Sequence, residues 1–284
     1  MTDGALRDLE FDLSGVGVRL SDLPEAISLF LESAWHPFAT ERATSRVLDI
    51  RVEARPVEPF SGTFDPKAMR AEISPESARY EMREGTVEVD ARGKGRVVVG
   101  IVEGSRPYYA FANLIRAALA WRMLSRGGAL LHAAGIILRD RAFVLAGPAD
   151  SGKSTWARLA EEAGGAVLSD DLVLLDGRGD GIEALGAPFR STHENTLGPG
   201  RWPLAAILFP VHGSEAALSP VSGIESCAKV LANLPFVADG VAADRRVTET
   251  IEAWIGSVPT RKLTFGRDSA FIDTLESFRP EEDG

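Results

Sequence analysis

The stretch AGPADSGKST, at positions 146–155, holds the residues whose spacing points most directly to chemistry. Gly147 and Gly152, followed at once by Lys153 and Ser154, complete the Walker A spacing G-x-x-x-x-G-K-S. Glycine lets backbone N–H groups close around phosphate oxygens, and a following helix adds its positive N-terminal end. The pattern predicts a nucleotide site, although a chance match in a glycine-rich chain is the alternative.

Different residues of the loop are expected to contact the phosphates, the metal ion and the rest of the nucleotide. We expect Lys153 to contact the β- and γ-phosphates and the Ser154 hydroxyl to ligate Mg²⁺. The other residues expected to line the nucleotide are Gly147, Asp150, Ser151, Gly152 and Thr155.

Two adjacent carboxylates, Asp170 and Asp171, follow the loop closely in the apolar run VLSDDLVLLD. Unpaired charges at the end of a buried strand are costly, so the pair favours a bound cation or a proton transfer. If one carboxylate ligates Mg²⁺, the other can accept the proton of an attacking hydroxyl, as in phosphoryl transfer to an alcohol. The alternative is an exposed turn, because Ser-Asp-Asp is a common turn sequence.

These residues need a strand, loop, helix and strand in that order. ALLHAAGIIL and AFVLAG predict a β-hairpin that leads into the loop, a helix is expected from about Lys153 to Ala163, and AVLSDDLVLLD predicts the next strand. Helical spacing of apolar residues predicts another helix over 108–125. The first hundred residues favour short alternating strands. We therefore expect a mixed α/β protein with a β-rich N-terminal domain over 1–105 and a loop-bearing domain over 106–284.

Composition excludes several classes of function. The net charge of −10 and the pI of about 5.0 disfavour binding to nucleic acid or to anionic membranes. A single cysteine, Cys227, excludes an internal disulfide and a structural zinc site. Without a signal sequence or a spanning apolar run, the chain is expected to be cytoplasmic and not inserted in a membrane.

The segment from LLHAAGIIL through GPADSGKSTWARLAEEAGGAVLSDDLVLL resembles the catalytic core of the HPr kinase/phosphorylase family and its related serine kinases. The shared features are a histidine followed by small residues, the Walker loop, and paired aspartates one short helix later. The resemblance covers about residues 128–176 firmly and the remaining C-terminal part weakly.

That resemblance implies a mixed sheet of the phosphoenolpyruvate carboxykinase type and phosphoryl transfer from ATP, or another nucleotide, to a serine. It implies Asp170 as the base, Asp171 and Ser154 as Mg²⁺ ligands, and His132 near the γ-phosphate. The basic, glycine-bearing segment that HPr kinases carry after the aspartates is not evident. We therefore expect a peptide or protein acceptor with a serine, other than HPr itself, and the unmatched N-terminal part could recruit it.

Weaker candidates lie in GAPFRSTHENTLGPGRWP, where Arg190 and Glu194, and less so His193, could contact the acceptor; a solvated loop is the alternative. Other functions stay open: a nucleotide-binding regulator or chaperone without catalysis, a kinase of small-molecule hydroxyls, and, last, a guanine-nucleotide switch, for which no Asn-Lys-x-Asp pattern is found. The sequence leaves the oligomeric state open, a homo-oligomer included.

Overall fold

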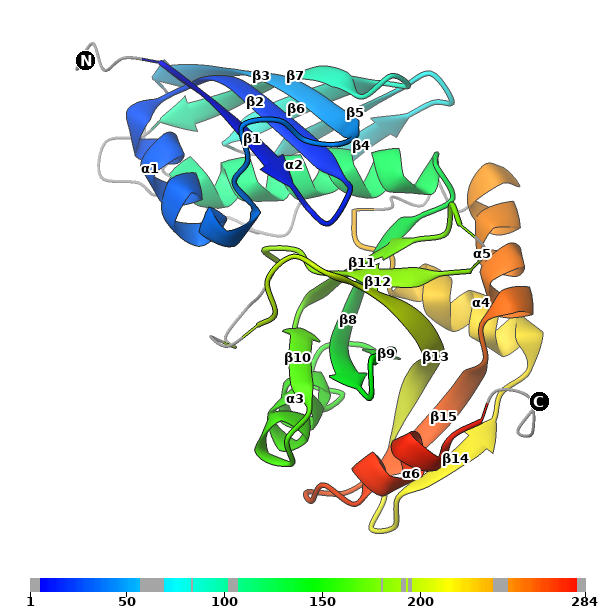
Figure 1. Cartoon of the computed structure of the whole chain (residues 1–284). Helices are drawn as coiled ribbons and strands as arrows, with labels where there is room; N and C mark the ends of the chain where they lie inside the picture. The colour runs from blue at the N-terminus through cyan, green and yellow to red at the C-terminus, as the bar shows by residue number, and fades with distance from the viewer. Residues whose placement is uncertain are drawn as a thin grey trace, which may run out of the picture. The chain divides into compact units, whose positions relative to one another are not determined.

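The computed structural model shows a mixed α/β chain with two mixed sheets, each in its own compact unit (Figure 1). It describes residues 6–56, 69–82, 84–101, 107–179, 181–189, 193, 196–236 and 245–279. The first unit is Met1–Ser125 with Phe236–Val241, and the second is Arg126–Pro235 with Ala242–Gly284. The division falls after residue 125 and not at the expected 105, because the helix over 107–124 packs on the first sheet.

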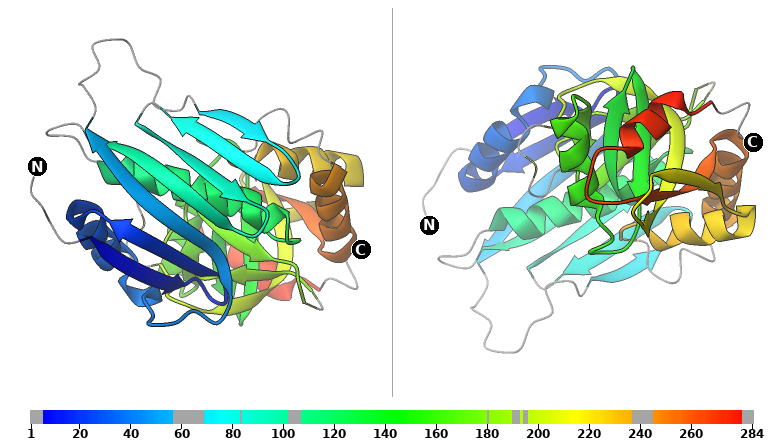
Figure 2. Two further views of the ribbon diagram at one scale, coloured as in Figure 1. Left: turned by 90° about the horizontal axis from the view of Figure 1, so that it is seen from above. Right: turned by 90° about the horizontal axis from the view of Figure 1, so that it is seen from below.

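The first unit is a seven-stranded sheet in the order β1-β2-β3-β7-β6-β5-β4. Its strands are β1 (Arg7–Asp12), β2 (Gly17–Leu23), β3 (Arg46–Pro56), β4 (Arg70–Ile73), β5 (Ser77–Met82), β6 (Gly85–Asp90) and β7 (Lys94–Ile101). Its helices are α1 (Glu25–Ala34), the short 3₁₀ helix η1 (His36–Phe38) and α2 (Pro107–Leu124). The helices α1 and α2 lie on one face of the sheet (Figures 1 and 2), and α2 packs against β5, β6 and β7.

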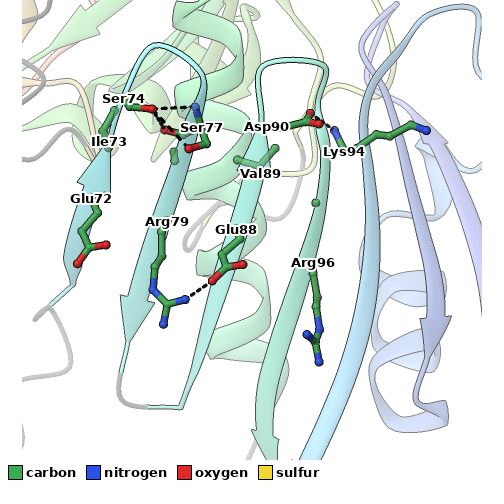
Figure 3. A pocket seen from close by; sticks show the side chains of 12 residues that line it. Glu72, Ile73, Ser74, Ser77, Arg79, Glu88, Val89, Asp90, Lys94 and Arg96 are labelled. Atoms are coloured by element: carbon green, nitrogen blue, oxygen red, sulfur yellow. Dashed lines mark hydrogen bonds and ion pairs between the residues drawn. The ribbon is translucent and has the colours of Figure 1, made fainter.

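The outer face of this sheet carries charged side chains in register across neighbouring strands. Arg79 of β5 lies opposite Glu72 and Glu88, and Glu88 lies opposite Arg96 (Figure 3). Arg79 forms an ion pair with Glu88, and Arg96 forms one with Glu53. A hollow of about 530 Å³ over this row is lined by three acidic and three basic side chains. Its balanced charge selects neither an anion nor a cation, and the face is typical of a solvated sheet surface.

The second unit contains eight strands and four helices among its described residues. The strands are β8 (Ala129–Leu138), β9 (Arg141–Ala146), β10 (Ala166–Ser169), β11 (Leu172–Asp176), β12 (Glu183–Leu185), β13 (Arg201–His212), β14 (Ala217–Pro220) and β15 (Thr260–Phe265). The helices are α3 (Lys153–Glu162), α4 (Gly223–Ala232), α5 (Arg245–Ser257) and α6 (Phe271–Ser277).

Strand β8 changes partners midway along its length. Its first half, up to His132, pairs with β11, and its second half, from Ala133, pairs with β9 on one side and β10 on the other. Strand β13 behaves similarly: it pairs first with β12 and then, in parallel, with β9 and β15. The carboxyl ends of β9, β13 and β15 therefore meet at one edge of the sheet, the edge from which the loop at 147–152 leaves.

Both faces of the sheet are covered around β13, which explains its unbroken apolar run. Ala206 and Leu208 face a core that also contains Trp156 of α3 and Phe271 of α6, whose ring centroids lie 5.8 Å apart. Phe209 points the other way, and the Lys229 ammonium of α4 lies 5.5 Å from its ring centroid. A strand that is buried on both faces has a continuous hydrophobic sequence, and not one in which hydrophobic and polar residues alternate.

The predicted hairpin, the helix after the loop and the helix over 108–125 are present as β8, β9, α3 and α2. The expected single strand in AVLSDDLVLLD is two short strands, β10 and β11, separated by a bend at Asp170 and Asp171. None of the described helices is long and apolar enough to cross a membrane.

Asp176, at the end of β11, is the centre of a buried charge cluster. Its carboxylate is 2% exposed and accepts hydrogen bonds from Arg178 (2.7 and 2.8 Å) and Arg201 (3.0 Å). Burial alone would raise the pKa of Asp176, but the hydrogen bonds and charges of Arg178 and Arg201 outweigh it and lower the pKa to about 2. Because the folded-state pKa lies below the unfolded value, this stabilisation is present above about pH 4 and is lost as the pH falls toward 2.

We expect Asp176→Asn to lower the free energy of unfolding by about 2 kcal/mol at pH 7, since it leaves two guanidinium groups without their carboxylate. The difference from the parent should roughly halve by pH 3, where the parent's unfolded carboxyl is largely protonated. Urea unfolding at both pH values measures this. Asp140→Asn, in the exposed β8–β9 turn, is the control and should change stability by less than about 0.5 kcal/mol. A pH-independent cost for Asp176→Asn would contradict the ion-pair account.

Candidate functional site

The loop between β9 and α3 closes around Lys153. The Lys153 Nζ donates hydrogen bonds to the carbonyl oxygens of Gly147 (2.7 Å) and Pro148 (2.8 Å), and the residue is 7% exposed. Gly152 precedes the helix with a φ of +96°, a left-handed conformation that glycine adopts without strain. The loop thus presents an ammonium group beside the N-terminus of a ten-residue helix, an arrangement suited to phosphate.

Polar atoms inside the loop fit a phosphate group. The Ser151 Oγ is buried and makes no hydrogen bond within the described part of the chain, and a buried hydroxyl without a partner is unusual. Ser154 and Thr155, on the first turn of α3, are exposed. A nucleotide phosphate would supply the missing partner of Ser151 and lie within reach of the helix N-terminus.

Ser169 shapes the bend that holds the two aspartates. Its Oγ donates to Phe189 O (2.5 Å) and accepts from the backbone N–H groups of Asp171 and Leu172 (both 3.2 Å). The Ser-Asp-Asp sequence is therefore a turn, as its composition suggested, but a turn inside the sheet and not an exposed one. Asp170 is only 4% exposed, whereas the side chain of Asp171 is 26% exposed.

The register of β8 relates the position of the aspartates to that of the loop. Ala133 is the Cα partner of Ala146, the last residue before the loop, and its N–H donates to the Asp171 carbonyl oxygen (3.0 Å) on the other side. Asp171 is therefore two strand spacings, or about 10 Å, from the start of the loop. The neighbouring residue on β8, His132, places its Nδ1 3.4 Å from Asp171 Oδ1.

Electrostatics link the loop lysine to these carboxylates. Burial lowers the pKa of Lys153, while the negative charges of Asp171 and Asp150 act in the opposite direction. Desolvation makes the ammonium group a stronger partner for an anion, because less water competes for it. An incoming phosphate would therefore meet a desolvated cation flanked by two carboxylates.

No protein-family model matches the chain, and no curated protein matches it.

Some of the predicted site residues lie close together in the structure, and others fall outside the described residues. The structure brings Gly147, Lys153, His132 and Asp171 to one edge of the second unit. Asp170, beside Asp171 in the bend, is buried, and its carboxylate accepts the His193 N–H. Arg190 and Glu194, the expected acceptor contacts, lie outside the described residues.

Magnesium would have to draw on few protein ligands. Within the ranges that the structure describes, no group of three or more His, Cys, Asp or Glu residues could hold a metal ion. Mg²⁺ usually binds one or two protein oxygens together with phosphates and water. Ser154, which is exposed, and Asp171, which is partly exposed, are the oxygen donors that suit it.

Two further residues border the loop that the sequence did not single out. A Cβ atom on Gly152 would lie 3.4 Å from the ring of Phe265 and 3.7 Å from that of His212. These are the last residues of β15 and β13. Because ligands gather at the carboxyl ends of parallel strands, the position of His212 directly after the apolar run PLAAILFPV was the signal that could have identified it.

Gly147 has a packing role that can be tested. A Cβ atom there would come within 2.7 Å of both Pro210 Cγ and Ser151 Oγ. We therefore expect Gly147→Ala to displace the loop and to weaken nucleotide binding by about 10-fold, equivalent to a cost within the usual range for overpacking. Calorimetric titration with ATP measures the affinity. Gly181→Ala, at a position with nothing within 4 Å of the added atom, is the control and should bind as the parent does.

Proposed function

We propose that this chain is a magnesium-dependent kinase of the HPr kinase type, which transfers a nucleotide phosphoryl group to a serine hydroxyl of a peptide or protein. The observation that carries the proposal is the enclosure of Lys153 by its own loop, close to a bend that contains the buried Asp170 and the partly exposed Asp171. Binding of a nucleotide needs only the loop. The carboxylates give a reason to propose transfer as well.

In this proposal the loop holds the donor. Lys153 neutralises charge on the β- and γ-phosphates, and the loop N–H groups orient them. His132 lies close to Asp171, and in this proposal it contacts the γ-phosphate. Ser154 and Asp171 would hold Mg²⁺, and the ion would neutralise part of the negative charge of the phosphates.

Asp170 takes the acceptor proton. The serine oxygen forms a bond to the γ-phosphorus while the bond from that phosphorus to the β–γ bridging oxygen breaks, and the nucleoside diphosphate leaves. The hydroxyl proton passes to the Asp170 carboxylate. Asp170 is the less solvated carboxylate, and Asp171 has the solvent access that an ion carrying its own water ligands requires.

The test is transfer of label from γ-labelled ATP and, separately, GTP, with Mg²⁺, into a bacterial lysate fractionated by size. A labelled peptide or protein band, with the label on serine, supports the proposal and identifies the acceptor. Label that appears only among small molecules would instead indicate a small-molecule kinase. Tight nucleotide binding without any transfer would overturn catalysis and favour a regulator.

A further inference from the structure

His193 connects the candidate base to the helix that follows the loop. Its backbone N–H donates to Asp170 Oδ2 (3.2 Å), and its ring Nε2 lies 3.1 Å from Glu161 Oε2 of α3. The His193 side chain is 13% exposed. Thr196, three residues further along the chain, forms an isolated parallel β-bridge with Val167 of β10.

The second contact joins the His193 ring to the Glu161 carboxylate. The atoms lie within ion-pair distance, although within the described residues the buried Nε2 has no partner aligned for a hydrogen bond. A buried ring nitrogen is costly unless a polar group faces it, and the Glu161 carboxylate fills that place. The ring is thereby held against α3, and the position of the ring fixes the backbone amide on the same residue.

We propose that His193 is a positioning residue that fixes the Asp170 carboxylate relative to α3, a role that rests on the proposed kinase function. Helix α3 carries Lys153 and Ser154 on its first turn and Glu161 near its end. One rigid helix would therefore determine the positions of the phosphate-binding residues. Through His193 it would also determine the orientation of the base. A misplacement of reacting groups by about 1 Å can cost about 100-fold in rate, so such a link has a measurable effect.

Three variants separate this role from simple packing. His193→Gln keeps an N–H donor where Nε2 stands, whereas His193→Asn has a donor that is too short to reach Glu161, and His193→Ala has none. We expect Ala and Asn to lower kcat for phosphoryl transfer about 10-fold with KM for the nucleotide within about 2-fold, and Gln to recover kcat to within about 3-fold of the parent. Equal kcat in all three variants, a Gln variant no better than Asn, or a parallel rise in KM would overturn the positioning role.

A second measurement needs no catalysis. Exchange of the His193 amide hydrogen, followed by NMR without nucleotide, should be at least about 10-fold faster in Asp170→Ala and also faster in Glu161→Ala, because each removes one of the two contacts. Unchanged exchange in an active enzyme overturns the positioning role alone. A chain that shows the exchange effect but phosphorylates no acceptor overturns the proposed function, and the positioning role with it.

Discussion

Lys153→Ala is expected to weaken ATP binding at least 100-fold and to remove phosphoryl transfer. The ammonium group is buried and held on two loop carbonyls, so its removal deletes a cation that the loop holds in place for the phosphates. Asp150 and Asp171, whose charges act on Lys153 in the parent, would then face the phosphates without compensation. Loss of one preorganised donor that stabilises charge in the transition state typically lowers kcat by about 100- to 1,000-fold.

Isothermal titration with ATP and Mg²⁺ measures the effect on binding. Lys229→Ala is the matched control, because Lys229 is a partly exposed lysine of the same unit whose partner is Glu225 of α4. It should bind ATP within about 2-fold of the parent. Lys153→Arg is also informative, since the bulkier guanidinium would not fit between the Gly147 and Pro148 carbonyls and should bind poorly as well. Parent-like ATP affinity in Lys153→Ala would show that the loop does not bind nucleotide in the manner proposed.

The loop could be predicted from the sequence because all its determinants are local. Gly147, Gly152 and Lys153 lie within seven consecutive positions, so their spacing can be recognised without knowledge of the distant residues that pack on the loop. The apolar run in β13 is likewise a local signal, because a strand that is buried on both faces has an unbroken hydrophobic sequence.

The geometry around the aspartates depends on strand pairing, which no local pattern specifies. His132 meets Asp171 because β8 pairs with β11 at this point and with β9 one residue later. From its own neighbourhood His132 was one histidine in an apolar strand, and only the family resemblance gave it a role. The break between β10 and β11 has the same origin: Ser169 caps the bend by bonding to Phe189 O, twenty residues further along the chain.

The contacts of His193 are a further feature that the sequence did not predict. The sequence analysis ranked it behind Arg190 and Glu194 as a candidate acceptor contact in a polar loop. In the structure its ring lies close to Glu161 of α3 and its amide donates to Asp170. A backbone amide that binds a carboxylate leaves no residue-type signature, so this contact could not be predicted from composition or spacing.

Asp170→Asn separates catalysis from binding, and its expected effect is the largest after that of Lys153. Asparagine has nearly the same size and can still accept the His193 N–H, so the bend should persist. Its amide oxygen is a very weak base, however, and the acceptor proton then has no carboxylate to receive it. We expect transfer to fall by about 100- to 10,000-fold, the usual contribution of general base catalysis, while ATP affinity stays within about 3-fold.

Asp176→Asn makes the same chemical change elsewhere in the second unit and is the control. It should lower stability and leave the transfer rate of the folded protein within about 2-fold, because its partners are Arg178 and Arg201 and not the loop. A protein that only binds nucleotide shows no transfer for Asp170→Asn to reduce. If Asp170→Asn transferred phosphate at the parent rate, the base would have to be sought at Asp171, the more exposed carboxylate beside His132. Asp171→Asn would then have to lower the rate without the loss of Mg²⁺ affinity that a metal ligand entails.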